Sequence, residues 1–256
     1  MSLTIALGGK GGTGKTTIAG LLVRYLVNNG MKPVLAIDAD SNANLNDVLG
    51  CELIETLSDA REMMKKDVPS GMTKDIFMEM KVEQALVESD GYDLVAMGQP
   101  EGPGCYCAAN NLLTSLIDRL MKNYEYLVID NEAGMEHFSR LTQKDIDLLI
   151  LVSDPSRRGL TAACRIAELV RGLPIHVTET LLVVNQLENG DQDWPEDVLR
   201  TFGEDHVYGL PSDPLLAQFD KEGKPTSQLP EDCPVVKAAN TLFEKLLKAR
   251  RGAFAA

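Results

Sequence analysis

Histidine, tryptophan and long apolar runs are scarce in this sequence of 256 residues, which contains three His and one Trp. No stretch approaches the roughly 18 consecutive apolar residues that mark a membrane-spanning helix, so we expect no membrane partner. Basic residues are also few, because 25 Lys and Arg stand against 38 Asp and Glu, a formal net charge of −13. Nucleic acid binding depends on cationic contacts with phosphates, so we expect no nucleic acid partner either.

Cysteines are few as well, and their number, five, is odd. A lysine and several glycines interrupt the N-terminal apolar run after Leu7, which does not fit a secretory leader. The sequence therefore predicts a reduced, cytoplasmic protein without a disulfide framework. Hydrophobic residues make up 44% of the chain, enough for a sizeable core, and we predict one domain over residues 1–256.

Short, continuously apolar runs alternate with segments of helical periodicity. Such runs are typical of strands buried on both faces, and their alternation with helices predicts an α/β fold with a mainly parallel sheet flanked by helices on both faces. We expect further helices, and no strand, between residues 52 and 90. The strands are predicted at residues 3–7, 34–37, 94–97, 126–129, 148–152, 181–184 and 207–210, and the clearest helices at 15–28, 110–122 and 160–171.

A phosphate-binding motif follows the first predicted strand. Residues 9–17 read Gly-Lys-Gly-Gly-Thr-Gly-Lys-Thr-Thr, which matches the pattern G-x-x-x-x-G-K-[ST] between a strand and a helix. Backbone N–H groups of such a loop cradle phosphates, the lysine reaches the β and γ phosphates, and the first threonine ligates Mg²⁺. We therefore expect an ATPase whose loop binds ATP through Gly11, Gly12, Thr13, Gly14, Lys15, Thr16 and Thr17.

The additional lysine at position 10 makes the motif more specific. The run from Lys10 to Thr16 resembles the deviant phosphate loop of the MinD, ParA and nitrogenase iron protein class of ATPases. The resemblance implies that Lys10 crosses a dimer interface to the nucleotide of the partner subunit. It therefore implies a homodimer that closes around two ATP molecules.

Three aspartates end predicted strands at the edge where α/β proteins bind ligands: Asp38, Asp40 and Asp130. Asp130 ends an apolar strand in the manner of a carboxylate that holds Mg²⁺ through water. The resemblance implies that Asp38 also holds a water on Mg²⁺, and that Asp40 orients the attacking water. Catalysis would therefore rest on Lys10, Lys15 and Asp40.

The same resemblance places the adenine base at two later loops. One follows the strand that ends at Asn185, whose amide can both donate and accept hydrogen bonds. The other contains Leu210, Pro211 and Asp213. By chemistry alone, an ordinary turn is an equally good interpretation of both loops.

A Gly- and Pro-rich loop carries two thiols one residue apart, Cys105 and Cys107, ahead of a predicted helix. A helix N-terminus favours the thiolate, and thiolates select soft metals such as Ni²⁺ or Zn²⁺ over Mg²⁺. Two thiolates cannot close a four-coordinate site, but a twofold dimer brings four. We therefore predict a Ni²⁺ or Zn²⁺ ion shared between two subunits.

Two segments together resemble the CooC family of nickel-inserting ATPases. They are Pro-Glu-Gly-Pro-Gly-Cys-Tyr-Cys at 100–107 and Asp-Asn-Glu-Ala-Gly-Met-Glu-His at 130–137, and the match extends from Lys10 to about residue 214. The resemblance implies a homodimer in which ATP hydrolysis drives nickel insertion into carbon monoxide dehydrogenase or acetyl-CoA synthase.

Two other functions remain open from the sequence. One is a positioning ATPase of the MinD or ParA kind, which would need neither cysteine. The other is a reductase like the nitrogenase iron protein, with a [4Fe–4S] cluster on the same four thiolates. That family takes its cluster cysteines from separate loops, which counts against the second alternative.

Overall fold

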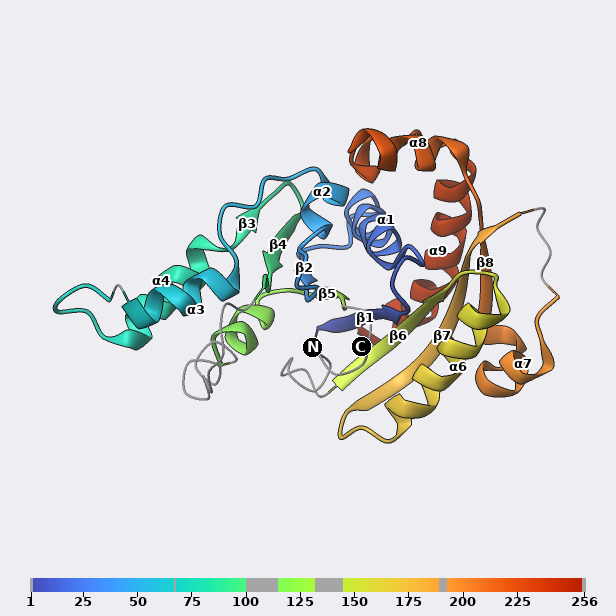
Figure 1. Ribbon diagram of the computed structural model, residues 1–256, viewed down its shortest axis with the longest axis horizontal. Coiled ribbons are helices and arrows are strands. Elements are labelled where there is room, and N and C mark those ends of the chain that lie inside the picture. Colours follow the sequence, from blue (N-terminus) through green and yellow to red (C-terminus); the bar gives the residue numbers. More distant parts are fainter. Residues whose placement is uncertain (1, 67, 100–114, 132–144, 189–192, 255–256) are drawn as a thin grey trace.

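A single twisted sheet runs through the computed structural model, which describes residues 2–66, 68–99, 115–131, 145–188 and 193–254 (Figure 1). Within these ranges eight strands pair in the order β3-β4-β2-β5-β1-β6-β7-β8, and only β3 is antiparallel to its neighbour. This confirms the predicted α/β fold with a mainly parallel sheet. The strands are β1 (Leu3–Gly9), β2 (Val34–Asp38), β3 (Val87–Glu88), β4 (Tyr92–Ala96), β5 (Tyr126–Asp130), β6 (Asp145–Ser153), β7 (His176–Leu187) and β8 (Val207–Pro211).

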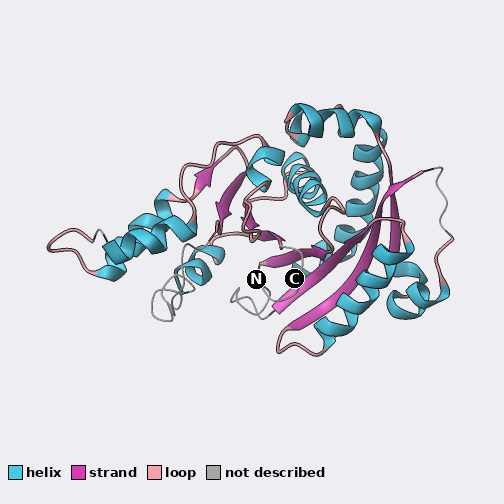
Figure 2. Ribbon diagram, viewed as in Figure 1, coloured by secondary structure: helices cyan, strands magenta, loops and turns pink. Residues whose placement is uncertain are grey.

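Helices cover both faces of the sheet, as Figure 2 shows. In the part of the chain that the structure describes, no helix is both long and apolar enough to cross a membrane. Residues 115–121 are helical and belong to the helix predicted at 110–122. The other elements are α1 (Lys15–Asn28), α2 (Leu45–Leu49), α3 (Leu57–Lys66), α4 (Lys74–Gln84), α6 (Arg157–Arg171), α7 (Glu196–Phe202), α8 (Pro214–Glu222) and α9 (Pro234–Phe254), with short 3-10 turns η2 (Glu204–His206) and η3 (Thr226–Gln228).

The core lies in two layers because side chains of each central strand alternate between the two faces. In β1, Ile5 and Leu7 pack in one cluster with side chains of α1 and α9, while Ala6 belongs to the cluster on the α6 face. All seven residues of β1 are buried. Burial of each large aliphatic side chain stabilises the fold by about 1.5–3 kcal/mol, so β1 is a well-anchored base for the loop that follows it.

The segment between residues 52 and 90 forms the predicted helices, α3 and α4, which lie beyond the β3 edge of the sheet (Figure 1). The prediction of no strand in this interval is wrong, because β3 pairs there with β4. Two residues, Val87 and Glu88, are too few to produce a hydrophobic pattern. Met64 and Met78 of this segment are buried in the core.

Three central strands bring their carboxyl ends to the same edge of the sheet. In the register of the sheet, Asp130 of β5 pairs with Leu7 of β1 on one side and with Asp38 of β2 on the other. The loop after β1 therefore begins beside two strand-terminal carboxylates. Parallel register alone places these groups together, as the sequence predicts.

Candidate functional site

The loop between β1 and α1 is a tight connection that depends on two glycines. Gly9 has φ +140°, and a Cβ there would collide with the carbonyl oxygen of Val152. Gly14 has φ +89°, and a Cβ there would collide with the amide nitrogen of Asn185. Gly14 supplies no side-chain cap to α1, so the first N–H groups of this helix remain available to an anion.

Internal hydrogen bonds give this loop its shape. The Thr13 hydroxyl donates to the carbonyl oxygen of Lys10 over 2.9 Å, and the Lys15 ammonium donates to the same oxygen over 3.2 Å. Thr13 and Lys15 are buried, whereas Lys10 is exposed. The loop thus points one lysine inward and leaves the other at the surface.

A cavity of about 610 Å³ extends from this loop toward α8. Its size is in the range of small-ligand sites, and it joins the phosphate loop to the two loops expected to bind the base. Most of the predicted nucleotide residues line it; Thr13 and Leu210 do not. The lining residues are Gly11, Gly12, Gly14, Lys15, Thr16, Thr17, Asp40, Asn42, Asn44, Val48, Asn185, Gln186, Pro211, Ser212, Asp213, Leu216, Ala217 and Asp220.

Several of these residues were missed from the sequence. Asn42 and Asn44 closely follow Asp40 in the sequence. This closeness is the only sequence feature from which their place in the site could have been predicted. Leu216 and Asp220 lie one turn apart on α8, whose place against the cleft is set by contacts far apart in the chain.

Two carboxylates at this edge are almost completely buried. Burial raises the pKa of Asp38 to about 6, against the opposing effect of backbone hydrogen bonds from Leu45 and Asp40. Burial likewise raises the pKa of Asp130 to about 7, while the Thr16 side chain and the Lys15 ammonium lower it. The Asp38 carboxylate raises the pKa of Asp130 further, and the nearby Asp40 raises that of Asp38, because like charges repel.

The environment of Asp130 fits a magnesium ion. Among the described residues, neither carboxylate oxygen of Asp130 has a hydrogen-bond partner of standard geometry, and neither does the side-chain oxygen of Asn131. Such buried, unpaired acceptors beside the Thr16 hydroxyl suit Mg²⁺, which takes one or two carboxylates together with waters and substrate phosphates. No group of three His, Cys, Asp or Glu side chains that could form a closed metal site occurs in the described ranges.

Asp40 differs from Asp38 in being partly exposed to the cavity. One of its carboxylate oxygens accepts hydrogen bonds from the backbone and side-chain amides of Asn42, at 2.9 and 3.0 Å. Asp40 and the phosphate loop therefore line the same cavity.

The residues predicted to read the base are largely engaged in protein contacts. The Asn185 amide donates to the carbonyl oxygen of Thr13 over 3.0 Å, and the Leu210 side chain is buried in the core. Pro211 lines the cavity as expected.

Asp213 holds two helices with one carboxylate. One oxygen accepts from Leu215 and Leu216 at the start of α8, at 2.9 and 3.3 Å. The other accepts from the thiol of Cys233 at 3.0 Å and from the backbone of Val235, in α9, at 3.2 Å. Asp213 thus fixes the α8 wall of the cavity.

The predicted soft-metal ligands, Cys105 and Cys107, lie outside the described residues. The flanking residues are described: Met97 and Gly98 precede the segment, and the helical residues 115–121 follow it.

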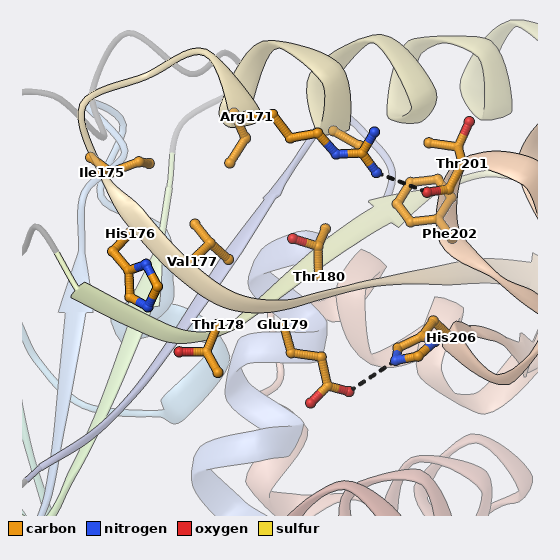
Figure 3. Close-up of a pocket in the computed structure, with 12 residues that line it drawn as sticks. Arg171, Ile175, His176, Val177, Thr178, Glu179, Thr180, Thr201, Phe202 and His206 are labelled. Carbon is orange, nitrogen blue, oxygen red and sulfur yellow. Dashed lines mark hydrogen bonds and ion pairs between the residues drawn. The ribbon is translucent and has the colours of Figure 1, made fainter.

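A second cavity, of about 450 Å³, lies near the amino end of β7, between α6, α7 and η2 (Figure 3). Arg171 donates there to the carbonyl oxygen of Thr201 over 3.1 Å, and His206 lies 3.5 Å from the carboxylate of Glu179. Arg171 therefore already has a backbone partner, and His206 already lies against Glu179. The cavity is also at the opposite end of β7 from Asn185, so it is separate from the phosphate loop.

The fold, the phosphate loop and the buried carboxylates together define a P-loop nucleotide-binding ATPase. A family model described as the CobQ/CobB/MinD/ParA nucleotide binding domain matches residues 4–226. The chain belongs to this family of P-loop ATPases.

Individual relatives agree with this assignment. An uncharacterized ATP-binding protein of Methanocaldococcus jannaschii is 38% identical over 97% of this chain and 100% of its own length. The carbon monoxide dehydrogenase accessory protein CooC of Rhodospirillum rubrum is 37% identical over 68% of this chain and 71% of its own length. Among solved structures, the septum site-determining protein MinD of Pyrococcus horikoshii, complexed with Mg-ADP, shares the fold with a TM-score of 0.70, 21% identity and 98% coverage of both chains.

The raised pKa of Asp130 predicts how stability depends on pH. Because its folded pKa is about 7, against an ordinary value near 4, ionisation of Asp130 weakens the metal-free fold progressively as pH rises from about 4 to 7. Asp130→Asn should therefore raise the free energy of unfolding at pH 8 by about 1–3 kcal/mol, and have little effect near pH 4. Urea unfolding in EDTA, without nucleotide, measures this. Asp40→Asn is the control, and an unchanged pH profile in Asp130→Asn would contradict the interpretation.

The contacts of Asp213 predict a second effect on stability. Asp213→Ala removes the cap of α8 and an acceptor from the start of α9, so we expect unfolding to become easier by about 2–3 kcal/mol. Burial raises the pKa of Asp213, but hydrogen bonds from Cys233 and the two helices lower it more, so the net pKa lies below the ordinary value. Its contribution is therefore present above about pH 4 and lost as pH falls further.

Asp220→Ala is the matched control for Asp213→Ala, because Asp220 lies on the same helix and burial raises its pKa. Denaturant unfolding at pH 7 compares the two variants. Equal stability of both would show that the Asp213 carboxylate is not a helix cap in solution.

Proposed function

We propose that this chain is an ATP-driven nickel metallochaperone that inserts nickel into carbon monoxide dehydrogenase or acetyl-CoA synthase and acts as a homodimer. The similarity to CooC over 187 residues supports this class of client. The cysteine pair Cys105 and Cys107 supplies the soft ligands that Ni²⁺ or Zn²⁺ requires. The metal is cargo, held by four thiolates across the dimer.

In this proposal ATP binds in the cavity at the carboxyl ends of the strands. The loop residues 9–17 bind the phosphates, with Lys15 on the β and γ phosphates. Mg²⁺, held by Thr16 directly and by Asp38 and Asp130 through water, neutralises charge on the phosphates. Asp40 orients the attacking water. The base lies toward Asn185 and Pro211, beside the α8 wall.

One observation best supports a coupling between nucleotide binding and metal binding. The cysteine segment leaves the sheet at the end of β4, beside Asp38. Ala96, at the end of β4, pairs with Asp38, and the Met97 N–H donates to the Asp38 carbonyl over 2.8 Å. The Gly- and Pro-rich segment that carries both cysteines follows directly. After it the chain returns through residues 115–121 to β5, which ends in Asp130.

Helix α3 fixes the start of this segment from the other side. The Ser58 N–H donates to the carbonyl oxygen of Met97 over 2.9 Å, and its hydroxyl donates to that of Gly98 over 3.2 Å. The cysteine segment is thus attached to the part of the sheet that would hold Mg²⁺. A change at the nucleotide would therefore act on the start of the cysteine segment through the hydrogen bond from Met97 to Asp38.

The exposed Lys10 is the residue that would join two subunits. Lys15 is buried in the loop, whereas the Lys10 side chain is exposed. The Lys10 ammonium can therefore contact the nucleotide of a partner subunit. Moving such a dimer from mostly open to mostly closed needs roughly 5 kcal/mol of differential binding, which a charge-assisted contact with the γ-phosphate together with Mg²⁺ can supply.

Nickel titration tests the metal site directly. Apoprotein titrated with Ni²⁺ should bind about one ion per two chains, and Cys105→Ser/Cys107→Ser should abolish tight binding. Calorimetry with light scattering measures the stoichiometry and the mass in the same samples. Cys51→Ser is the matched control, because Cys51 is a half-buried thiol on another part of the chain.

Three results would overturn the carrier proposal. No tight Ni²⁺ in the wild type, or Ni²⁺ retained in the double variant, would favour a positioning ATPase of the MinD kind. Absorbance near 400 nm after anaerobic purification would indicate an iron–sulfur cluster and a reductase.

Substitution of Lys10 tests the dimer. Lys10→Ala should keep the monomer's affinity for Mg-ADP, because Lys10 contributes only its backbone to its own loop. It should lose dimer formation with a non-hydrolysable ATP analogue and reduce kcat by at least tenfold. Lys32→Ala, an exposed lysine between α1 and β2, is the control. An ATP-dependent dimer in Lys10→Ala would exclude the cross-subunit role.

A further inference from the structure

The side chain of Asn185 forms a hydrogen bond with the phosphate loop. Its side-chain N–H donates to the carbonyl oxygen of Thr13 over 3.0 Å, and only 5% of the residue is exposed. The bond joins β7 to residues 172 positions earlier in the chain. The donor is therefore aimed at the backbone of the loop, within which Thr13 also bonds to Lys10.

The contact is close because the loop has no side chain at the next position. A Cβ at Gly14 would overlap the amide nitrogen of Asn185. Asn185 thus packs against the residue at which the loop turns into α1. The glycine at position 14 serves both the left-handed backbone and the approach of this amide.

The backbone of β7 is distorted at this position. The pairing of β7 with β8 shifts register between Val184 and Leu187, and Gln186 has φ +62°, a left-handed conformation that is uncommon for a residue other than glycine. A bulge of this kind changes the direction of the neighbouring side chains. Strained backbone of this kind gathers at functional sites, where the surrounding structure maintains it.

The hydrogen bond has a direct consequence for phosphate binding. In a trans peptide the carbonyl and the following N–H point in opposite directions, so holding the Thr13 carbonyl toward Asn185 also fixes the Gly14 N–H. A Thr13 carbonyl turned into the loop would instead place a negative dipole against phosphate oxygens. The Asn185 amide prevents this arrangement.

We propose that Asn185 is a positioning residue for phosphate binding, which holds the Thr13–Gly14 peptide in the orientation that accepts a polyphosphate chain. This role is additional to any contact with the base. It rests on the proposed binding of ATP phosphates by residues 9–17. This role predicts that Asn185 raises the affinity of the protein for phosphate ligands that carry no base. A role in base recognition alone does not predict this.

The test uses Mg-tripolyphosphate, which has phosphates but no base or sugar. Its affinity is measured by displacement of a fluorescent ATP analogue from the full-length protein. Loss of one hydrogen bond predicts about 3- to 10-fold weaker tripolyphosphate binding in Asn185→Ala. Asn185→Asp, which keeps the shape but replaces the donor with an acceptor, should lose more, and KM for ATP should rise more than kcat falls.

Asn123→Ala is the matched control, because it removes an exposed amide just before the amino end of β5, at the edge of the sheet opposite the phosphate loop. It should leave tripolyphosphate binding unchanged. Circular dichroism and the unfolding midpoint identify any variant that fails to fold. In that event the NMR shift of the Gly14 amide in Asn185→Ser, which retains a shorter donor, tests the same peptide orientation.

Tripolyphosphate affinity equal to the wild type in folded Asn185→Ala and Asn185→Asp would overturn the inference. Lys15→Ala separates this result from failure of the proposed nucleotide site. If Lys15→Ala also binds ATP and tripolyphosphate as the wild type does, the phosphate loop itself is not the binding site. If only the Asn185 variants are unaffected, the loop binds phosphate without help from β7.

Discussion

Two buried carboxylates that meet at the ends of adjacent parallel strands are the constraint on which this site depends. Asp38 and Asp130 are paired in register, and burial raises the pKa of both. Each must take up a proton, pair with a cation or remain a desolvated charge beside another. Because β1 lies next to β5 and continues into the phosphate loop, a cation that relieved this repulsion would lie beside that loop. In the proposed mechanism, magnesium and nucleotide would therefore favour each other's binding.

Polar side chains in the walls of the cavity form hydrogen bonds within the protein itself. Asp213 accepts hydrogen bonds from the starts of α8 and α9, and the Asn185 amide donates to the phosphate loop. Both were expected at the base, and both do lie at the cavity, but their hydrogen bonds go to backbone groups. A cleft of this kind is preorganised, because its shape is fixed before a ligand arrives. Preorganisation reduces the ordering that binding must otherwise bring about.

Much of the fold could be predicted because strands buried on both faces leave continuous apolar runs. All seven predicted strands and the helix at 15–28 are present. The longer reach of β6 and β7 could not be predicted, since their first residues, such as Asp145 and His176, are polar and interrupt the pattern. The phosphate loop and the strand-terminal aspartates were visible because their spacing is local.

The bonds of Asp213 and Asn185 were not visible, because they join residues 20 and 172 positions apart. An N-cap signal precedes α8 in the sequence, since Asp213 is followed by Pro214. No local pattern shows that the same carboxylate also serves α9. Long-range polar contacts of this kind arise only once the sheet has assembled.

The order of the strands bears on the proposed coupling between the nucleotide site and the cysteine pair. The chain between β4 and β5 carries the cysteines, and these two strands lie on either side of β2, which ends in Asp38. In the proposed mechanism, a charge change at Asp38 and Asp130 would therefore act at both ends of that chain. At the β4 end the link is one hydrogen bond, from Met97 to the Asp38 carbonyl, and Ser58 holds the other side of the same residue. These bonds attach the described start of that chain to the backbone of Asp38, so a displacement of Asp38 would move this start with it.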